Sequence, residues 1–106
     1  MISKRGRLSG AGVFQQILWA RGHPVEYAVA ERIFVLRSAT PARRHLTIGL
    51  FGQVYVPTAV QHAVGISPRD NLLLVACPTS GVVIVLPPDT VRAALSPVLA
   101  QFQVSA

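Results

Sequence analysis

Residues 51–87 constrain the fold most strongly, because a strand, a short helix and a hairpin follow one another there without a break. Apolar positions alternate over 54–56, which is the period of a strand. Pro57 then suits the start of a helix, and about two turns with one apolar side follow it. Gly65 suits the left-handed position that ends a helix. Two apolar strands that form a hairpin are expected over 72–76 and 82–86.

The order and spacing of these elements resemble the AbrB/MazE/SpoVT-like swapped-hairpin DNA-binding domain. Members of that family carry a pattern of the type G-R-V-x-I-P-x-x-[LI]-R-x-x-L-G-[LI]-x-x-G-D-x-[LV], followed by a short hairpin and a hydrophobic last strand. The residues that correspond here are Gly52-Gln53-Val54-Tyr55-Val56-Pro57, Val60-Gln61-His62-Ala63-Val64-Gly65-Ile66 and Pro68-Arg69-Asp70-Asn71-Leu72. The resemblance covers about a third of the chain directly. It implies a DNA-binding transcription factor or an antitoxin.

The first third of the chain repeats this order in a weaker form. Gly6 lies 46 positions before Gly52, and Trp19 lies 47 positions before Ile66. In the family, two units interleave their hairpins into one closed β-barrel, normally as a homodimer. Two copies in one chain therefore imply a single-chain pseudo-dimer, similar to that of some actinobacterial members. The expected parts are a degenerate first repeat over 1–37, a linker over 38–44, a second repeat over 45–87 and a C-terminal helix within 88–106.

The expected fold class is mainly β with short helices (α+β), and the resemblance makes it a swapped-hairpin AbrB-like β-barrel built from two repeats plus the C-terminal helix. Short helices are expected near 11–19 and 57–64. In the last segment, apolar residues from Val91 to Phe102 recur at helical spacing after Asp89, a suitable N-cap. Pro97 predicts a kink or a break near Ser96. We expect this helix to cover the barrel, with contact to a partner's helix as the alternative.

Few residues precede Gly6, so the first repeat has no room for the opening strand that the second one has. An unpaired strand edge invites pairing with another chain. We therefore expect a homodimer, and a complete single-chain pseudo-dimer is the alternative.

The net charge of +6 lies entirely in the first half of the chain. Residues 1–46 hold eight basic and two acidic side chains, and residues 47–106 hold two of each. Such asymmetry favours a polyanionic partner, most commonly nucleic acid, over charge that serves solubility alone. No apolar stretch is long enough to span a membrane, and no secretory signal is recognisable, so we expect a cytoplasmic protein without a membrane partner.

Catalytic, cofactor and metal sites are not expected. The four carboxylates are spread along the sequence, and the three histidines share no metal-ligand spacing with Cys77, which we expect to be a buried thiol. Enzymatic activity is therefore not expected.

In the family, basic side chains on the first hairpin strands and on the short helix contact DNA. The second repeat departs from that pattern, since Gln53 follows its glycine and its helix presents Gln61 and His62. Arginine and lysine bind phosphate oxygens, and arginine also binds guanine edges. The expected DNA-binding residues are Lys4, Arg5, Arg7, Arg43, Arg44 and His45, with Gln53, Gln61 and His62 as further hydrogen-bonding members.

A DNA-binding transcriptional regulator of the AbrB/SpoVT type is thus the leading hypothesis. The alternative is a protein-interaction module or antitoxin-like barrel whose DNA contacts have eroded. An RNA-binding barrel is disfavoured, because most of the aromatic residues are expected to face the core.

Overall fold

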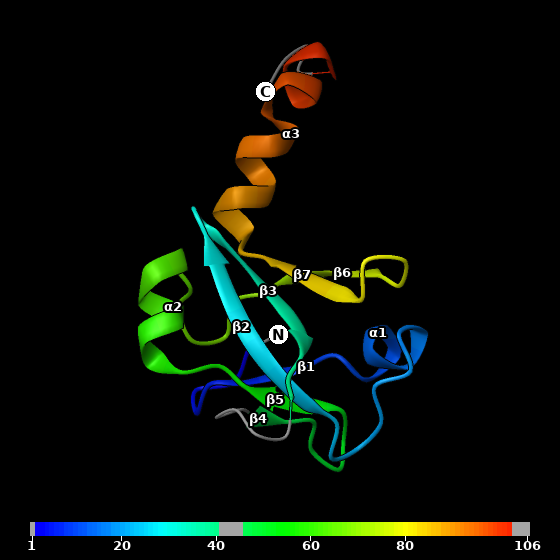
Figure 1. The fold of residues 1–106 in the computed structure, drawn as a ribbon. Helices are drawn as coiled ribbons and strands as arrows, with labels where there is room; N and C mark the ends of the chain where they lie inside the picture. The colour runs from blue at the N-terminus through cyan, green and yellow to red at the C-terminus, as the bar shows by residue number, and fades with distance from the viewer. Residues whose placement is uncertain (1, 41–45, 103–106) are drawn as a thin grey trace.

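The computed structural model of the chain describes residues 2–40 and 46–102. Its strands form two antiparallel sheets, and a C-terminal helix projects from one end of the resulting α+β domain (Figure 1). In chain order the elements are β1 (Arg7–Ser9), α1 (Ala11–Gln16), β2 (Pro24–Ala30), β3 (Ile33–Ser38), β4 (Leu46–Thr47), β5 (Gln53–Tyr55), α2 (Thr58–Val64), β6 (Leu73–Cys77), β7 (Val82–Leu86) and α3 (Pro88–Phe102).

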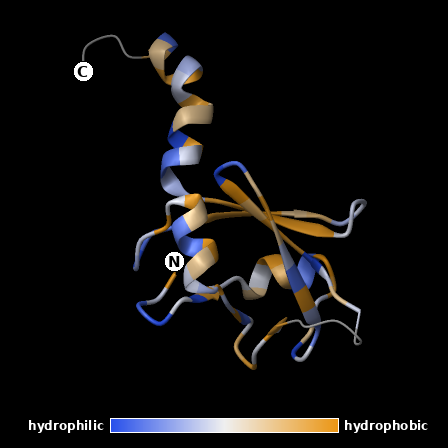
Figure 2. Cartoon of the chain, turned by 60° about the vertical axis from the view of Figure 1, so that its left-hand side comes forward, coloured by the Kyte–Doolittle hydropathy of each residue, from blue (hydrophilic) through white to orange (hydrophobic). Residues whose placement is uncertain are grey.

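The larger sheet has five strands in the order β4-β2-β3-β7-β6. It consists of two hairpins, β2–β3 and β6–β7, which are joined side by side through β3 and β7. Phe34 pairs with Val85 and Leu36 pairs with Val83, and all four side chains are buried. Alternation along both strands therefore places one face of the sheet in the core (Figure 2).

The smaller sheet is a two-stranded ribbon formed by β1 and β5. Arg7 lies opposite Tyr55, Leu8 opposite Val54, and Ser9 opposite Gln53. Both sheets thus join a strand from the first half of the chain to a strand from the second half. The two halves share one core, to which both contribute buried residues.

The α2 helix has the boundaries that its sequence predicts to within one residue. Pro57 occupies the cap position just before Thr58, and Gly65 ends the helix in the left-handed conformation with φ 73°. In the first half, Leu18 takes this conformation with φ 62° after the shorter helix α1, although leucine has a Cβ that disfavours it. The expectation of a helix over 11–19 was therefore too long.

Several hydrogen bonds within the first half of the chain have counterparts within the second half, at a nearly constant separation in the sequence. The Gly6 amide donates to the Ser3 carbonyl at 3.0 Å, and 46 positions later the Gly52 amide donates to the Gly49 carbonyl at 3.1 Å. Both glycines have positive φ values, 79° and 67°. The same type of turn therefore precedes β1 and β5.

The residues that follow the two short helices also correspond. The Trp19 amide donates to the Phe14 carbonyl and the Ile66 amide donates to the Gln61 carbonyl, each at 2.8 Å. Trp19 and Ile66 are each only 5% exposed. In both halves, the residue at this position after the short helix is thus buried in the core.

The C-terminal helix differs from its expectation. We expected α3 to cover the rest of the domain, but none of its residues in the described range is buried. It begins at Pro88, one residue before the expected cap Asp89. Of the kink or break expected near Ser96, the break does not occur, because the helix continues through Pro97. The long axis of the molecule, 53 Å against 29 and 24 Å, reflects this projection (Figure 1).

Within the described ranges, no helix is both long and apolar enough to cross a membrane. Cys77 at the end of β6 is half-buried rather than buried as expected.

Candidate nucleic-acid interface

The β1–β5 ribbon presents one polar face to solvent. Leu8 and Val54 are buried beneath it, so the residues on either side of each point outward. Arg7 is exposed, Gln53 is half-buried, and Tyr55 is 45% exposed. The ribbon therefore displays a cation, an amide and an aromatic ring on one surface.

A turn that carries two more cations leads into this ribbon. Lys4 and Arg5 are exposed, and the Ser3 hydroxyl accepts hydrogen bonds from the backbone amides of Arg5, at 3.3 Å, and Arg7, at 3.1 Å. Gly6 closes the turn against the second half of the chain, because a Cβ there would lie 2.8 Å from Gln61 Nε2. The turn is thus fixed, and three of the expected DNA-binding residues lie together.

The corresponding turn before β5 is apolar rather than basic. Leu50 and Phe51 occupy the positions of Lys4 and Arg5, and they are 60% and 76% exposed. Because β1 and β5 are antiparallel, the two turns lie toward opposite ends of the ribbon. One end of the exposed surface is therefore basic and the other is apolar.

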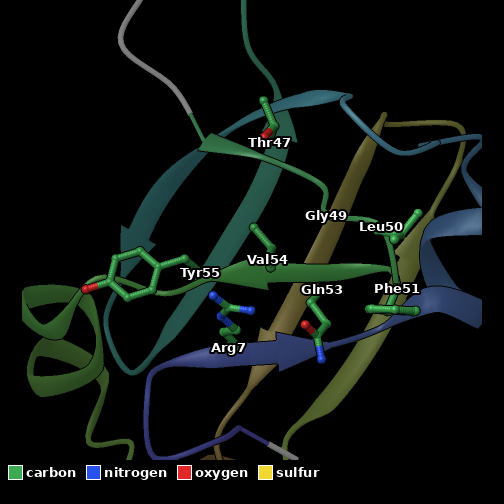
Figure 3. A pocket seen from close by; sticks show the side chains of 8 residues that line it. All are labelled: Arg7, Thr47, Gly49, Leu50, Phe51, Gln53, Val54 and Tyr55. Atoms are coloured by element: carbon green, nitrogen blue, oxygen red, sulfur yellow. The ribbon is translucent and has the colours of Figure 1, made fainter.

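A hollow of about 340 Å³ lies along this surface. Figure 3 shows Arg7 and Gln53 near its middle, Tyr55 toward one end, and Leu50 and Phe51 toward the other. A second hollow of about 460 Å³ lies beside α1 and shares Leu50 and Phe51 with the first. The exposed apolar turn thus stands between two concave surfaces.

Tyr27 fastens the ribbon to the larger sheet. Its hydroxyl donates a hydrogen bond to the backbone carbonyl of Tyr55, and its ring packs edge-on against Phe34 at a centroid distance of 5.9 Å. Burial, with a smaller contribution from Tyr55, raises the pKa of the Tyr27 phenol above its usual value. The phenol therefore remains a donor throughout the physiological range.

The short helix α2 carries two of the residues expected to bind DNA, Gln61 and His62. The Gln61 side-chain amide donates to the Val56 carbonyl at 2.8 Å, so its nitrogen supports the loop beside Gly6. His62 is exposed in the last turn of the helix. Of the two α2 residues expected at the interface, only His62 has a side chain with no bond recorded in the described part of the chain.

Arg43, Arg44 and His45 lie outside the described residues, so their expected role stays a prediction. Other basic residues are distributed elsewhere. The Arg37 Nε atom lies 2.7 Å from Glu26 Oε1 across the β2–β3 pair, and Arg21 and Arg69 are exposed in turns. Among the described residues, the cations that belong to the ribbon or to the turn before it are thus Lys4, Arg5 and Arg7.

Three of the aromatic residues are exceptions to the expectation that most of them face the core. Phe51, Tyr55 and Phe102 are 76%, 45% and 75% exposed. A signal for the first was present in the sequence, because Phe51 lies between Gly49 and Gly52 and corresponds in position to the charged Arg5. Such a position belongs to a turn, and turn residues lie at the surface.

Comparison of the chain with family models, with curated proteins and with solved structures gives no match. Within residues 2–40 and 46–102, no group of three or more histidine, cysteine, aspartate or glutamate side chains is placed to hold a metal ion.

Proposed function

We propose that this chain is a DNA-binding transcriptional regulator of the AbrB/SpoVT type, which contacts duplex DNA through the β1–β5 ribbon and the basic turn before it. The observation that carries the proposal is the grouping of three exposed cations, Lys4, Arg5 and Arg7, on a hydrogen-bonded turn and the strand that follows it. No acidic partner is recorded for these three side chains within the described residues. Cations presented in this way neutralise phosphates and release counterions from the duplex.

We further propose that the chain consists of two related repeats with interleaved hairpins, as in the swapped-hairpin barrel. The pairing of β3 with β7 and of β1 with β5 supports this arrangement, since each pair joins the two halves. The bonds that cross between halves also correspond. Val56 N donates to Gly6 O at 2.7 Å, and Gly10 N donates to Gly52 O at 3.0 Å. This reciprocity is the relationship that a two-fold axis produces.

The proposed contact is unequal in its two halves. The first repeat supplies Lys4, Arg5 and Arg7, whereas the second has Leu50, Phe51 and Gln53 at the corresponding positions. Three phosphate contacts from the first repeat correspond to a log–log salt slope of about −3. Contacts from Arg43, Arg44 and His45 would bring the slope nearer to −5.

Fluorescence anisotropy with a labelled random-sequence duplex, titrated at several salt concentrations, tests the proposal. We expect binding whose affinity falls linearly on a log–log plot, with a slope between these two values. Absence of binding at low salt, or affinity that does not depend on salt, would falsify the proposal.

A protein-interaction module is the second candidate. The observation that favours it is the exposed apolar surface at Leu50 and Phe51 together with the uncovered helix α3. In that case substitutions at Lys4, Arg5 and Arg7 leave partner binding unchanged, and substitutions at Leu50 and Phe51 abolish it. The same set of variants therefore separates the two candidates.

A further inference from the structure

The α3 helix leaves the domain without resting on it. Of its fifteen residues, from Pro88 to Phe102, none is buried. The contact at its base is a hydrogen bond from the Thr90 hydroxyl to the Arg32 carbonyl, at 2.9 Å. In both views the helix extends away from the sheets, and only its first turns lie near them (Figures 1 and 2).

A helix of this length needs a covering surface. Isolated helices shorter than about 12–15 residues are marginal in water, because the cost of nucleation is spread over few hydrogen bonds. Pro97 weakens α3 further, since it has no N–H to donate to the carbonyl of Ala93. A covering surface would therefore stabilise α3, and its own domain buries none of its residues.

The apolar residues of α3 follow the spacing of a helix-pairing seam. Val91, Leu95, Val98 and Phe102 are separated by four, three and four positions, which is the a/d spacing of a heptad. Leu95 is 46% exposed, Val98 is 50% and Phe102 is 75%. The helix is about 22 Å long, which accommodates two heptads.

The irregular features of α3 lie away from this seam. At 100° per residue, Ala93 falls on the opposite side of the helix, and Pro97 lies more than a quarter-turn from the seam. The proline ring therefore does not enter the seam. A second helix could approach without meeting either residue.

The charges of α3 indicate what kind of partner covers it. Its only charged residues are Asp89 and Arg92, and they form an ion pair with each other. Helices that bind membrane surfaces or nucleic acid carry several lysines or arginines on the polar face, which α3 lacks. A neutral helix does not repel its own copy, although the chain as a whole carries a charge of +6.

We propose that α3 pairs with α3 of a second copy of this chain through the seam formed by Val91, Leu95, Val98 and Phe102. The chain is then a dimer in which each protomer keeps its own domain. This association goes beyond the proposed function and does not depend on it, because the seam lies outside the ribbon and its turns.

Sedimentation equilibrium of the full chain without nucleic acid tests the proposal. We expect a monomer–dimer equilibrium for the natural sequence. Replacing the seam residues in the double variant Leu95→Glu, Val98→Glu should raise the dissociation constant by roughly tenfold or more, since two carboxylates would have to be buried in each protomer. The control Ala93→Glu, Ala100→Glu adds the same charge on the opposite side and should leave the constant unchanged.

Phe102→Ala provides a milder change at the end of the seam and should weaken the dimer without introducing charge. Trp19 fluorescence reports whether the domain remains folded in each variant, because this residue is buried far from α3. A natural chain that stays monomeric at high micromolar concentration overturns the proposal. So does a Leu95→Glu, Val98→Glu variant that dimerises as strongly as its control. Duplex binding, measured separately on the same variants, shows whether the proposed function stands without the dimer.

Discussion

Leu8 lies directly opposite Val54 in the β1–β5 ribbon, and both side chains are buried although they are 46 positions apart. Gly6 and Gly52 have the same separation and close equivalent turns. On its buried face, the ribbon therefore pairs corresponding residues of the two halves. On the outside they differ, since Arg7 of the first half corresponds to Gln53 of the second.

The double variant Arg5→Ala, Arg7→Ala should weaken duplex binding while the domain stays folded, because both side chains are exposed and neither supports the core. Each lost phosphate contact reduces the salt slope by about one, so the slope should become shallower by about two. Salt-titrated anisotropy measures the change. Arg43→Ala with Arg44→Ala should act in the same direction.

Arg21→Ala is the control for that experiment, since it removes an exposed cation from a turn that belongs neither to the ribbon nor to the basic turn before it. Arg69→Ala should likewise change DNA binding little. If both double variants bind the duplex as the natural chain does, the basic half serves solubility and the interaction module becomes the better proposal.

Gly52→Ala should destabilise the domain more than Gly81→Ala. Both glycines have positive φ, 67° and 69°, so both changes incur the strain of a left-handed conformation, about 1–2 kcal/mol. At Gly52 the new Cβ would also lie 2.5 Å from the Cβ of Ala11, whereas nothing lies within 4 Å at Gly81. Thermal or urea unfolding measures the difference. Equal losses of stability would mean that the approach of α1 to the turn before β5 is not tight.

Leu18→Gly should raise stability. Leu18 has φ 62° and is 86% exposed, so it contributes strain and little burial at the position that corresponds to Gly65. Relief of about 1–2 kcal/mol of strain is partly offset by about 0.4–1 kcal/mol from the greater freedom of glycine in the unfolded chain. The expected net gain is about 0.5–1 kcal/mol in the free energy of unfolding. A lower melting temperature for this variant would contradict the expectation.

Tyr27→Phe should lower stability by about 1 kcal/mol near neutral pH, because the Tyr55 carbonyl loses its donor. The pKa of Tyr27 is raised on folding, so the folded state holds the phenolic proton more firmly than the unfolded state does. Stability from this group is complete below the unfolded pKa of about 10 and falls as the pH rises above it. Chemical unfolding at neutral and alkaline pH should therefore show a smaller alkaline loss for Tyr27→Phe than for the natural chain. Tyr55→Phe, which removes an exposed hydroxyl instead, should keep most of that loss.

The sequence predicted those elements whose signals are local. A short continuous apolar run located β7 at Val82–Leu86, and Gly65 marked the end of α2, because both signals depend on a few adjacent residues. The cations Lys4, Arg5 and Arg7 were predicted to act together because they are neighbours in the chain.

The error at α3 concerns a relationship that no local pattern contains. The apolar face of α3 is the same whether a helix covers its own domain or projects from it, so the sequence could not say which applies. Phe51 and Tyr55 were assigned to the core because aromatic residues are usually buried. The turn that exposes Phe51 depends on the fit of Gly52 against Ala11, which comes from a distant part of the chain.

The unequal turns before β1 and β5 have a consequence that a symmetric assembly could not have. In a homodimer of single repeats every substitution appears twice, so a basic turn on one side requires the same basic turn on the other. A chain that carries both halves can change one without the other, and here one turn holds Lys4 and Arg5 while its counterpart holds Leu50 and Phe51. Bound to a double helix, such a surface would have two chemically different ends, one basic and one apolar. It would distinguish a sequence from its reverse complement, so the site that one chain contacts need not be a palindrome.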